Sequence, residues 1–352
     1  MSIYTYKNLY RTYLDCRKNK RKTINALKFE LNLEENLMAL LKELRQGIYR
    51  PGRSICFVVK EPTPREIFAA DFRDRIVHHL FVGELIGSAE KLFIFDSFAC
   101  RKGKGTHRAV KRLYKFMRRA VQNSRRKIWF MKLDLKSFFM SINHEILYSI
   151  VLALIEKEEK SIAWKREMAA LAKILIFHKP AENYLRKGNL KLAKLIPANK
   201  SLLCQPPRQG LPIGNYTSQF FANLYLNGLD HFIKRQLKCG YYLRYVDDLV
   251  FLADRADTLK NYREKIKNFI KTHLRLAINN SKTIIQPIER GIDFLGYFLK
   301  TDRAYVRRQV LKRYKNKLFR ITIGKLKTSR QHFLPMFKSY EGHFKFALSL
   351  TK

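Results

Sequence analysis

RYVDDLVFL, the stretch Arg244–Leu252, places two adjacent aspartates, Asp247 and Asp248, in the middle of a largely apolar run. A carboxylate is costly to bury among apolar side chains, and two neighbouring carboxylates also repel each other. The stretch therefore predicts one of two arrangements. Either a tight hairpin carries the aspartates at a tip in water, or strong positive charge compensates them.

The composition indicates a polyanionic partner. The chain of 352 residues has 71 Lys and Arg against 29 Asp and Glu, which gives a formal net charge of +42. Because this charge is spread along the whole chain, a compact protein would repel itself unless a polyanion neutralised it. We expect nucleic acid as the partner. An anionic membrane surface is the weaker alternative, since the sequence has no amphipathic anchor and no lipidation motif.

The cysteines and apolar runs predict a cytoplasmic protein with no membrane partner. The five cysteines are scattered and form no Cys-x-x-Cys pair, so we expect reduced thiols and no zinc site. The longest wholly apolar run, Ile150–Ile155, is too short to span a membrane. The N-terminus lacks the apolar core of a signal peptide.

The pattern of apolar and turn residues predicts mixed helices and strands. Short helices are expected over 1–50, and a strand, a Pro-bounded turn and a second strand over 49–72. Further expected elements are a buried helix at Arg75–Ile86, a buried strand beginning at 128, a helix at His144–Lys157, a helix within 210–232, a hairpin over 241–252, a helix at about 258–277, and basic helices from 303 onward.

Two basic segments have open interpretations. The loop FACRKGKGTHRAV (98–110) precedes a predicted helix, so it suits phosphate binding, but a solvated basic loop explains it equally well. The Lys-rich stretch 158–208 is interpreted as an insertion that follows a nucleic-acid backbone or binds a partner. The sequence does not decide between these two roles.

Three aspartates form the candidate catalytic constellation. Asp134 ends an apolar strand, and Asp247 and Asp248 lie at a hairpin tip. If these strands are neighbours, three carboxylates converge and need a counter-charge. Two Mg²⁺ ions about 3.5–4 Å apart would supply it, activating a 3′-hydroxyl and stabilising a leaving pyrophosphate. Taken alone, Asp134 is better explained as a capping or ion-paired residue, and the Asp-Asp pair as an ordinary hairpin tip.

The chain resembles reverse transcriptases through seven motifs that occur in that family's order over about 50–340. They are PREIFAADFRDRIVHHL, SFACRKGKGTH, LDLKSFFMSI, GLPIGNYTSQFFANLYL, YVDD, NNSKT and FLGYFL. The resemblance implies an α+β right-hand polymerase fold with fingers, a palm of antiparallel sheet plus helices, and a short helical thumb. The implied segments are an N-terminal helical extension (1–50), fingers (51–127), palm (128–300, with the insertion at about 158–208) and thumb (301–352).

The resemblance also implies a role for each matching residue. Asp134, Asp247 and Asp248 would be catalytic metal ligands, and Leu135 would add its backbone carbonyl. The metal would be two Mg²⁺ ions, for which Mn²⁺ can substitute. The deoxynucleotide site would comprise Lys60, Arg65, Leu135, Phe139, Ile213, Gly214 and Lys282.

Within this nucleotide site, Phe139 would block a ribose 2′-hydroxyl, and Arg65 with Lys60 would hold the triphosphate. Lys282 would offset charge on the pyrophosphate. Each has a structural alternative: core packing for Phe139, a phosphate contact without catalytic part for Arg65, and a solvated loop for Lys282. Gly296 would position the primer end or simply form a turn.

The fourth motif, GLPIGNYTSQFFANLYL, narrows the resemblance to one group of reverse transcriptases. Ile213-Gly214 and Ser218-Gln219 give the form IGxxxSQ, which resembles reverse transcriptases of diversity-generating retroelements, a group II intron-like bacterial lineage. This implies error-prone, adenine-mutagenised cDNA for diversification of a target gene (mutagenic retrohoming). A glutamine in place of Ile213 would contact the nucleotide sugar. Isoleucine cannot make this contact, so the enzyme should check the geometry of the new base pair less strictly. The alternative is that Ile213 only fills volume.

The implied partners are template RNA and its RNA–DNA hybrid, dNTPs and a small basic accessory protein, in the cytoplasm of a bacterial or phage-infected cell. Two alternatives stay open. One is a reverse transcriptase of another bacterial lineage, group II intron-like or phage-defence. The other is a catalytically inactive nucleic-acid-binding scaffold.

Overall fold

The chain divides into two compact units, each with its own sheets and core. The computed structural model describes residues 2–18, 20–60, 63–122, 127–324 and 330–351. The first unit comprises Met1–Ile94, Leu135–His231 and Phe269–Ala277, and the second comprises Phe95–Asp134, Phe232–Asn268 and Ile278–Lys352. The units alternate along the sequence, so the predicted division into extension, fingers, palm and thumb stays a prediction.

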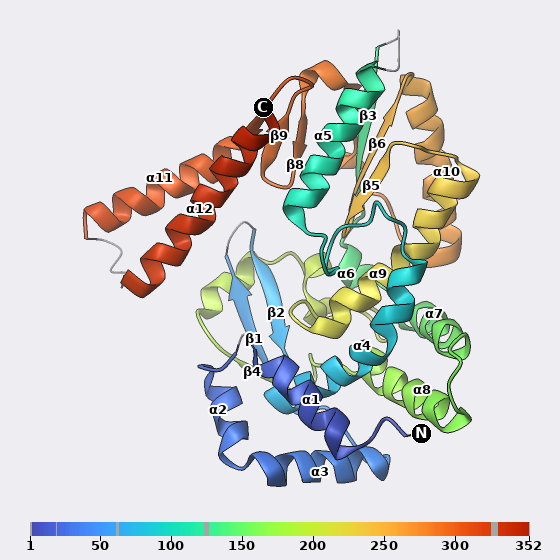
Figure 1. The fold of residues 1–352 in the computed structure, drawn as a ribbon, viewed down its shortest axis with the longest axis vertical. Helices are drawn as coiled ribbons and strands as arrows, with labels where there is room; N and C mark the ends of the chain where they lie inside the picture. Colours follow the sequence, from blue (N-terminus) through green and yellow to red (C-terminus); the bar gives the residue numbers. More distant parts are fainter. Residues whose placement is uncertain (1, 19, 61–62, 123–126, 325–329, 352) are drawn as a thin grey trace. The chain divides into compact units, whose positions relative to one another are not determined.

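The first unit is mainly helical (Figure 1). Its helices are α1 (Tyr6–Arg17), α2 (Ile24–Leu31), α3 (Leu33–Arg45), α4 (Phe72–Leu92), α6 (Phe138–Ser141), α7 (His144–Glu156), α8 (Ile162–Phe177) and α9 (Tyr216–His231). The predicted buried helix at Arg75–Ile86 is the middle of α4, which begins earlier because the Asp71 side chain accepts a hydrogen bond from the Arg73 amide.

Helix α8 lies inside the Lys-rich stretch and was not predicted. Its N-cap is Ser161, whose side chain accepts a hydrogen bond from the Trp164 amide. Its buried residues include Trp164, Met168 and Leu171, at the spacing of one helix face. The many lysines of this stretch hide the helical pattern when the stretch is judged by composition alone, although its apolar residues recur at helical spacing.

The sheet of the first unit has the order β2-β1-β4. Strand β1 (Ser54–Val59) pairs antiparallel with β2 (Arg65–Ala69) and parallel with β4 (Tyr184–Arg186). Residues 61–62 of the predicted turn lie outside the described residues. Strand β4 also lies in the 158–208 stretch, so this stretch folds onto its own chain. It is held there by buried Glu66, which accepts hydrogen bonds from the Leu202 amide (2.9 Å) and the Ser201 hydroxyl (3.1 Å).

The second unit is built on an antiparallel sheet of order β5-β6-β3-β7. Its strands are β3 (Trp129–Asp134), β5 (Tyr242–Tyr245), β6 (Asp248–Ala253) and β7 (Ile284–Pro287). A smaller antiparallel sheet contains β8 (Ile292–Phe294), β9 (Tyr297–Leu299) and β10 (Ala304–Val306). Strand β10 lies at the start of the region that was expected to be helical from 303. The sequence did not indicate this strand, because three residues are too few to show an alternating pattern.

The helices of the second unit are α5 (Thr106–Gln122), α11 (Arg308–Thr322) and α12 (Arg330–Thr351). Helix α10 (Ala256–Leu274) has residues in both units, and a π-helical segment covers Phe232–Gln236. Short 3-10 helices occur at Leu190–Leu195, Ala198–Lys200, Leu202–Cys204, Asn280–Lys282 and Ile288–Arg290. Helices α11 and α12 lie side by side (Figure 1), with the rings of Tyr314 and Tyr340 5.0 Å apart.

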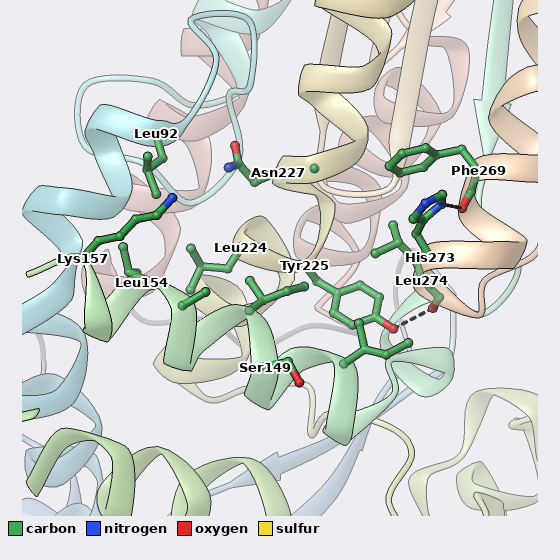
Figure 2. Close-up of a pocket in the computed structure, with 14 residues that line it drawn as sticks. Leu92, Ser149, Leu154, Lys157, Leu224, Tyr225, Asn227, Phe269, His273 and Leu274 are labelled. Atoms are coloured by element: carbon green, nitrogen blue, oxygen red, sulfur yellow. Dashed lines mark hydrogen bonds between the residues drawn. The ribbon is translucent and has the colours of Figure 1, made fainter. Parts of the chain in front are cut away.

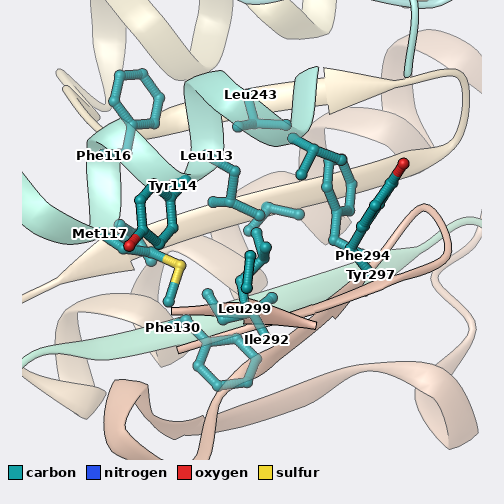
Figure 3. Close-up of a cluster of buried hydrophobic side chains, with 14 of the residues drawn as sticks. Leu113, Tyr114, Phe116, Met117, Phe130, Leu243, Ile292, Phe294, Tyr297 and Leu299 are labelled. Carbon is teal, nitrogen blue, oxygen red and sulfur yellow. The ribbon is translucent and has the colours of Figure 1, made fainter. Parts of the chain in front are cut away.

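The core of the second unit lies between α5 and the sheets, as Figure 3 shows. Leu113 of α5 packs in one cluster with Phe130 of β3, Leu243 of β5 and Phe294 of β8. Side chains alternate between the two faces of a sheet, so Phe130, Lys132 and Asp134 share this face. The alternation of side chains along β3 therefore places Asp134 at the edge of an apolar core.

No helix in the described ranges is long and apolar enough to cross a membrane. The five cysteines form no disulfide; Cys16, Cys56 and Cys239 are buried, whereas Cys100 and Cys204 are exposed.

Candidate active site

The aspartate pair lies in a tight hairpin, as the sequence predicted. The β5–β6 ladder pairs Tyr245 with Asp248, which leaves Val246 and Asp247 as the two-residue loop. Val246 has φ +55°, and the hand of such a short hairpin requires a positive φ at its first loop residue. This conformation costs a β-branched residue about 1–3 kcal/mol. The surrounding structure must therefore hold the loop in place.

Asp134 and Asp248 are directly opposite each other across the β3–β6 ladder. Opposed residues of an antiparallel pair bring their Cβ atoms to about 4.5–5.5 Å. Burial raises the pKa of the Asp248 carboxyl; Lys132 opposes this rise and Asp134 adds to it. The Lys132 ammonium nitrogen lies 3.4 Å from Oδ1 of Asp248. The strand ends thus hold two carboxylates together in a partly buried place.

Asp134 is held by residues that follow α10. The Asn279 side-chain amide donates to Oδ2 of Asp134 (2.9 Å), and the Asn279 backbone amide donates to the Asp134 carbonyl (2.8 Å). The ammonium nitrogen of Lys282 lies 3.5 Å from the same Oδ2. Sequence reasoning singled out Lys282 but missed Asn279, although Asn279 belongs to the same NNSKT motif. It also missed Lys132, which strand alternation places on the face of Asp134.

The donor set fits a divalent cation. Carboxylate oxygens are the ligands that Mg²⁺ prefers, and a cation between Asp134 and Asp248 would relieve both their repulsion and the cost of burial. Among the described residues, no group of three or more His, Cys, Asp or Glu side chains is close enough to hold a metal ion. The structure therefore unites two of the three predicted ligands, and Asp247 lies on the adjoining loop. Leu135 follows Asp134 directly and is buried.

Phe139 and Ile213 come together in the first unit. Both are partly buried against a cluster that we call the apolar shelf, formed by Cys56, Phe68, Met140 and Leu202. The Ile213 carbonyl accepts a hydrogen bond from the Phe68 amide (2.9 Å). These two predicted residues therefore share one support.

Gly214 follows Ile213, which packs against the shelf, and has φ +122°. A Cβ added there would lie 2.7 Å from Cγ2 of Ile67 and 3.3 Å from the Phe68 carbonyl oxygen. Only glycine allows the backbone to approach β2 this closely in this conformation.

Lys60 and Arg65 meet at one end of the β1–β2 hairpin. Arg65 pairs with Val59, and Lys60 follows directly. Both side chains are exposed, so both could reach an anionic ligand at this end.

A groove of about 470 Å³ lies elsewhere in the first unit, between α7, α9 and the end of α10 (Figure 2). Leu224, Tyr225 and Phe269 contribute to its mostly apolar wall, and the Tyr225 hydroxyl donates to the Leu274 carbonyl (2.6 Å). Over the part of the chain that the structure describes, no predicted site residue lines it.

Among curated proteins, two show similarity. Protein YkfC of Escherichia coli is 22% identical over 315 residues, covering 80% of this chain and 75% of that protein. The putative COX1/OXI3 intron 2 protein of Saccharomyces cerevisiae is 34% identical over 67 residues, 19% of this chain and 8% of that protein.

Two solved structures are similar in fold. Apo telomerase from Candida tropicalis has a TM-score of 0.52 at 13% identity, covering 73% of this chain and 49% of that one. Telomerase from Candida albicans in complex with a TWJ fragment of telomeric RNA has a TM-score of 0.51 at 11% identity, covering 79% and 52%. This chain spans about half the length of those chains. The likeness supports the expected α+β right-hand polymerase fold.

The family described as reverse transcriptase (RNA-dependent DNA polymerase) matches residues 59–299, which is more than half of the chain. This range contains the Asp134–Asp248 pair, Phe139 and Ile213, which pack against the apolar shelf, and Lys282. The chain therefore belongs to the reverse transcriptase (RNA-dependent DNA polymerase) family.

Proposed function

We propose that this reverse transcriptase extends a DNA primer at Asp134 and Asp248, with Asp247 as a third ligand, and that it makes the error-prone cDNA of a diversity-generating retroelement. One observation supports the site above all others: Asp134 is paired with Asp248 at the ends of β3 and β6, on one face of the sheet and beside the tight loop. Structural aspartates have no need to face each other in this way.

The surrounding residues have complementary parts in this proposal. Two Mg²⁺ ions, when bound, would activate the primer 3′-hydroxyl and stabilise the leaving pyrophosphate. Asn279 holds the Asp134 carboxylate in one orientation. Lys282, whose side chain is 59% exposed, can turn from Asp134 to a phosphate. Lys132 balances part of the charge of Asp248, because its ammonium nitrogen lies 3.4 Å from Oδ1 of Asp248.

The first unit would supply the nucleotide contacts. Arg65 and Lys60 would bind the triphosphate from the exposed hairpin end. Phe139 would exclude a 2′-hydroxyl, with the apolar shelf keeping its ring in position. Gly214 would keep the backbone beside Ile213 close to β2.

Template RNA, the RNA–DNA hybrid and dNTPs are the proposed ligands, with a small basic accessory protein as partner. The net charge of +42 supports a phosphate backbone as the main contact. Affinity for the hybrid should then fall steeply as salt rises. A nearly flat salt response would contradict this mode of binding.

The retroelement lineage is supported by the IGxxxSQ form and by the apolar setting of Ile213. A different bacterial lineage, group II intron-like, is the second candidate, and the match of 67 residues to the putative COX1/OXI3 intron 2 protein of yeast favours it. The two candidates differ in product accuracy, so one assay separates them.

Primer extension tests both levels of the proposal. The assay uses an RNA template containing all four bases, Mg²⁺, dNTPs and an annealed primer, with Asp247→Ala as the inactive control, and sequences every product. Extension by the wild type alone, with errors concentrated opposite template adenines, would support both levels. Accurate extension would retain the polymerase and reject the retroelement lineage. Failure to extend even with the native RNA and accessory protein would reject the proposed site.

A further inference from the structure

A fully buried arginine lies within the stretch that carries the aspartate loop. Arg244, in β5, has 0% of its surface exposed and is among the largest fully buried side chains. Burying a guanidinium is unfavourable unless its donors find partners in the protein. Arg244 has no part in the proposed catalysis, so its burial needs a separate explanation.

The guanidinium contacts the loop itself. Its Nη1 donates to the carbonyl of Val246 (3.1 Å), the loop residue with φ +55°. Its Nη2 donates to the hydroxyl of Ser97 (3.1 Å), which is also fully buried. One rigid planar group thus connects the strained loop to a second segment of the chain. A lysine at this position, with a single nitrogen, could not reproduce the fork.

The second segment is itself firmly anchored. The Arg244 amide donates to the Asp96 carbonyl (2.9 Å), and the Phe98 amide donates to the Arg244 carbonyl (3.0 Å). The Asp96 carboxylate is buried and accepts from Nε of Arg112, on α5, at 2.7 Å. It also lies 3.1 Å from the ammonium nitrogen of Lys234. The loop is therefore connected through Arg244 to a rigid part of the second unit.

The side chain reaches the loop from the face opposite the carboxylates. Arg244 pairs with Leu249, whereas Tyr245 pairs with Asp248. Since side chains alternate along a strand, Arg244 and Asp248 project from opposite faces of the sheet. Arg244 can thus support the loop without occupying the face where Asp134 and Asp248 meet.

We propose that Arg244 is a positioning residue. By holding the Val246 carbonyl, it fixes the left-handed loop and so sets Asp247 and Asp248 in the geometry for binding divalent cations. This inference rests on the proposed role of these aspartates. It requires no contact between Arg244 and substrate.

The test uses full-length Arg244→Lys, Arg244→Met and Ser97→Ala, with Arg263→Met, at an arginine whose side chain is 40% exposed, as a matched control. Mn²⁺ affinity is measured by electron paramagnetic resonance, alongside the Mg²⁺ concentration for half-maximal extension, the KM for dNTP and the melting temperature. Arg244→Lys should weaken Mn²⁺ binding about tenfold and raise the Mg²⁺ requirement equally, because residues that orient ligands typically contribute that much. Ser97→Ala should shift both in the same direction by about threefold. The KM for dNTP should hardly change.

Two results would overturn the inference. One is wild-type Mn²⁺ affinity in both Arg244→Lys and Ser97→Ala. The other is a lower melting temperature that lowers activity while Mn²⁺ affinity stays the same, which would make Arg244 merely structural. If Arg244→Met does not fold, the other two variants decide.

Asp248→Asn separates this inference from the proposed function. If Asp248→Asn abolishes Mn²⁺ binding and extension while the Arg244 variants match the wild type, only the positioning role fails. If Asp248→Asn itself behaves as the wild type, the proposed site fails.

Discussion

The two units support their predicted residues in different ways. In the second unit, Asp134 and Asp248 are fixed by a strand ladder and by a hydrogen bond from Asn279. In the first unit, Phe139 and Ile213 are partly buried and are held only by packing against the apolar shelf. Charged ligands need defined positions, whereas an apolar surface needs only the right volume. Changes in the second unit should therefore abolish synthesis, and changes in the first should alter selectivity or stability.

The largest effect is expected for Asp134→Asn. This change keeps the shape of the side chain but removes a charge that would bind metal, so DNA synthesis should fall about a thousandfold. The measurement is single-turnover primer extension, combined with thermal melting. The fold should persist, because removing one of two opposed carboxylates also removes their repulsion.

Asp257→Asn is the matched control for this carboxylate. Asp257 is exposed, lies in the first turn of α10 and forms an ion pair with Lys260. Exposed ion pairs contribute about 0–1 kcal/mol, so this variant should extend primers as the wild type does. Equal activity of both variants would remove Asp134 from the proposed site.

Gly214→Ala should have the next largest effect, on stability. Its added Cβ would meet Ile67 and the Phe68 carbonyl, and φ +122° is unfavourable for any side chain. We expect a loss of about 3 kcal/mol in the free energy of unfolding. Urea unfolding followed by the fluorescence of Trp164 in α8 measures it, in a Trp129→Phe background that leaves only a first-unit tryptophan.

Gly228→Ala provides the comparison. Gly228 lies in α9, and no atom lies within 4 Å of the Cβ that alanine would add. Alanine favours a helix over glycine by up to about 1 kcal/mol, so this variant should be as stable as the wild type or more stable. Similar losses in both variants would mean that the shelf backbone adapts to a side chain.

Local patterns in the sequence predicted the hairpin at Asp247-Asp248, the strand that ends at Asp134 and most of the helices. Alternation and turn chemistry act between neighbours, and they are visible in any short window. The motif order predicted the family and the right-hand fold. These successes rest on features that the linear sequence displays directly.

Three of the missed features depend on residues far apart in the chain. Strand β4 exists because Tyr184–Arg186 pairs with β1, and nothing in those three residues signals a strand. The role of Asn279 depends on its contact with Asp134, and that of Arg244 on its contact with Ser97. Spacing along a sequence does not reveal which carboxylate or carbonyl a polar side chain will meet.

Because His78 is buried, we expect the first unit to lose stability in acid. His78 lies in α4, and burial, followed by the nearby His178 and His79, lowers its pKa from 6.5 to about 3. The unfolded chain therefore binds a proton between these values that the folded chain does not. Stability is fully present above pH 6.5 and falls as the pH drops toward 3, by about 1.4 kcal/mol per pH unit from His78 alone.

Urea unfolding at about pH 7, 6 and 5 measures this slope. We expect about 2 kcal/mol of stability to be lost between neutral pH and pH 5, and His78→Gln should flatten the curve. Exposed His273→Gln is the control and should leave it unchanged. An unaltered slope in His78→Gln would show that other groups, such as His79, whose pKa is lowered to about 4, dominate.

The smallest effect is expected on accuracy, for Ile213→Gln. The glutamine would restore a hydrogen-bonding group beside the nucleotide sugar, and a net hydrogen bond contributes about 1 kcal/mol, or roughly fivefold in a rate ratio. Misincorporation opposite template adenines should therefore fall about fivefold, while total synthesis changes little. Sequencing of products copied from an RNA template with all four bases gives both quantities.

Ile213→Leu distinguishes polarity from volume at the apolar shelf. It keeps an apolar side chain of similar size against the apolar shelf, so the error rate should stay at the wild-type level. An equal fall in errors for both variants would mean that packing against the shelf, and not the missing hydrogen bond, sets accuracy. No change in either variant would place the control of fidelity outside the shelf and leave Ile213 as a residue that fills volume.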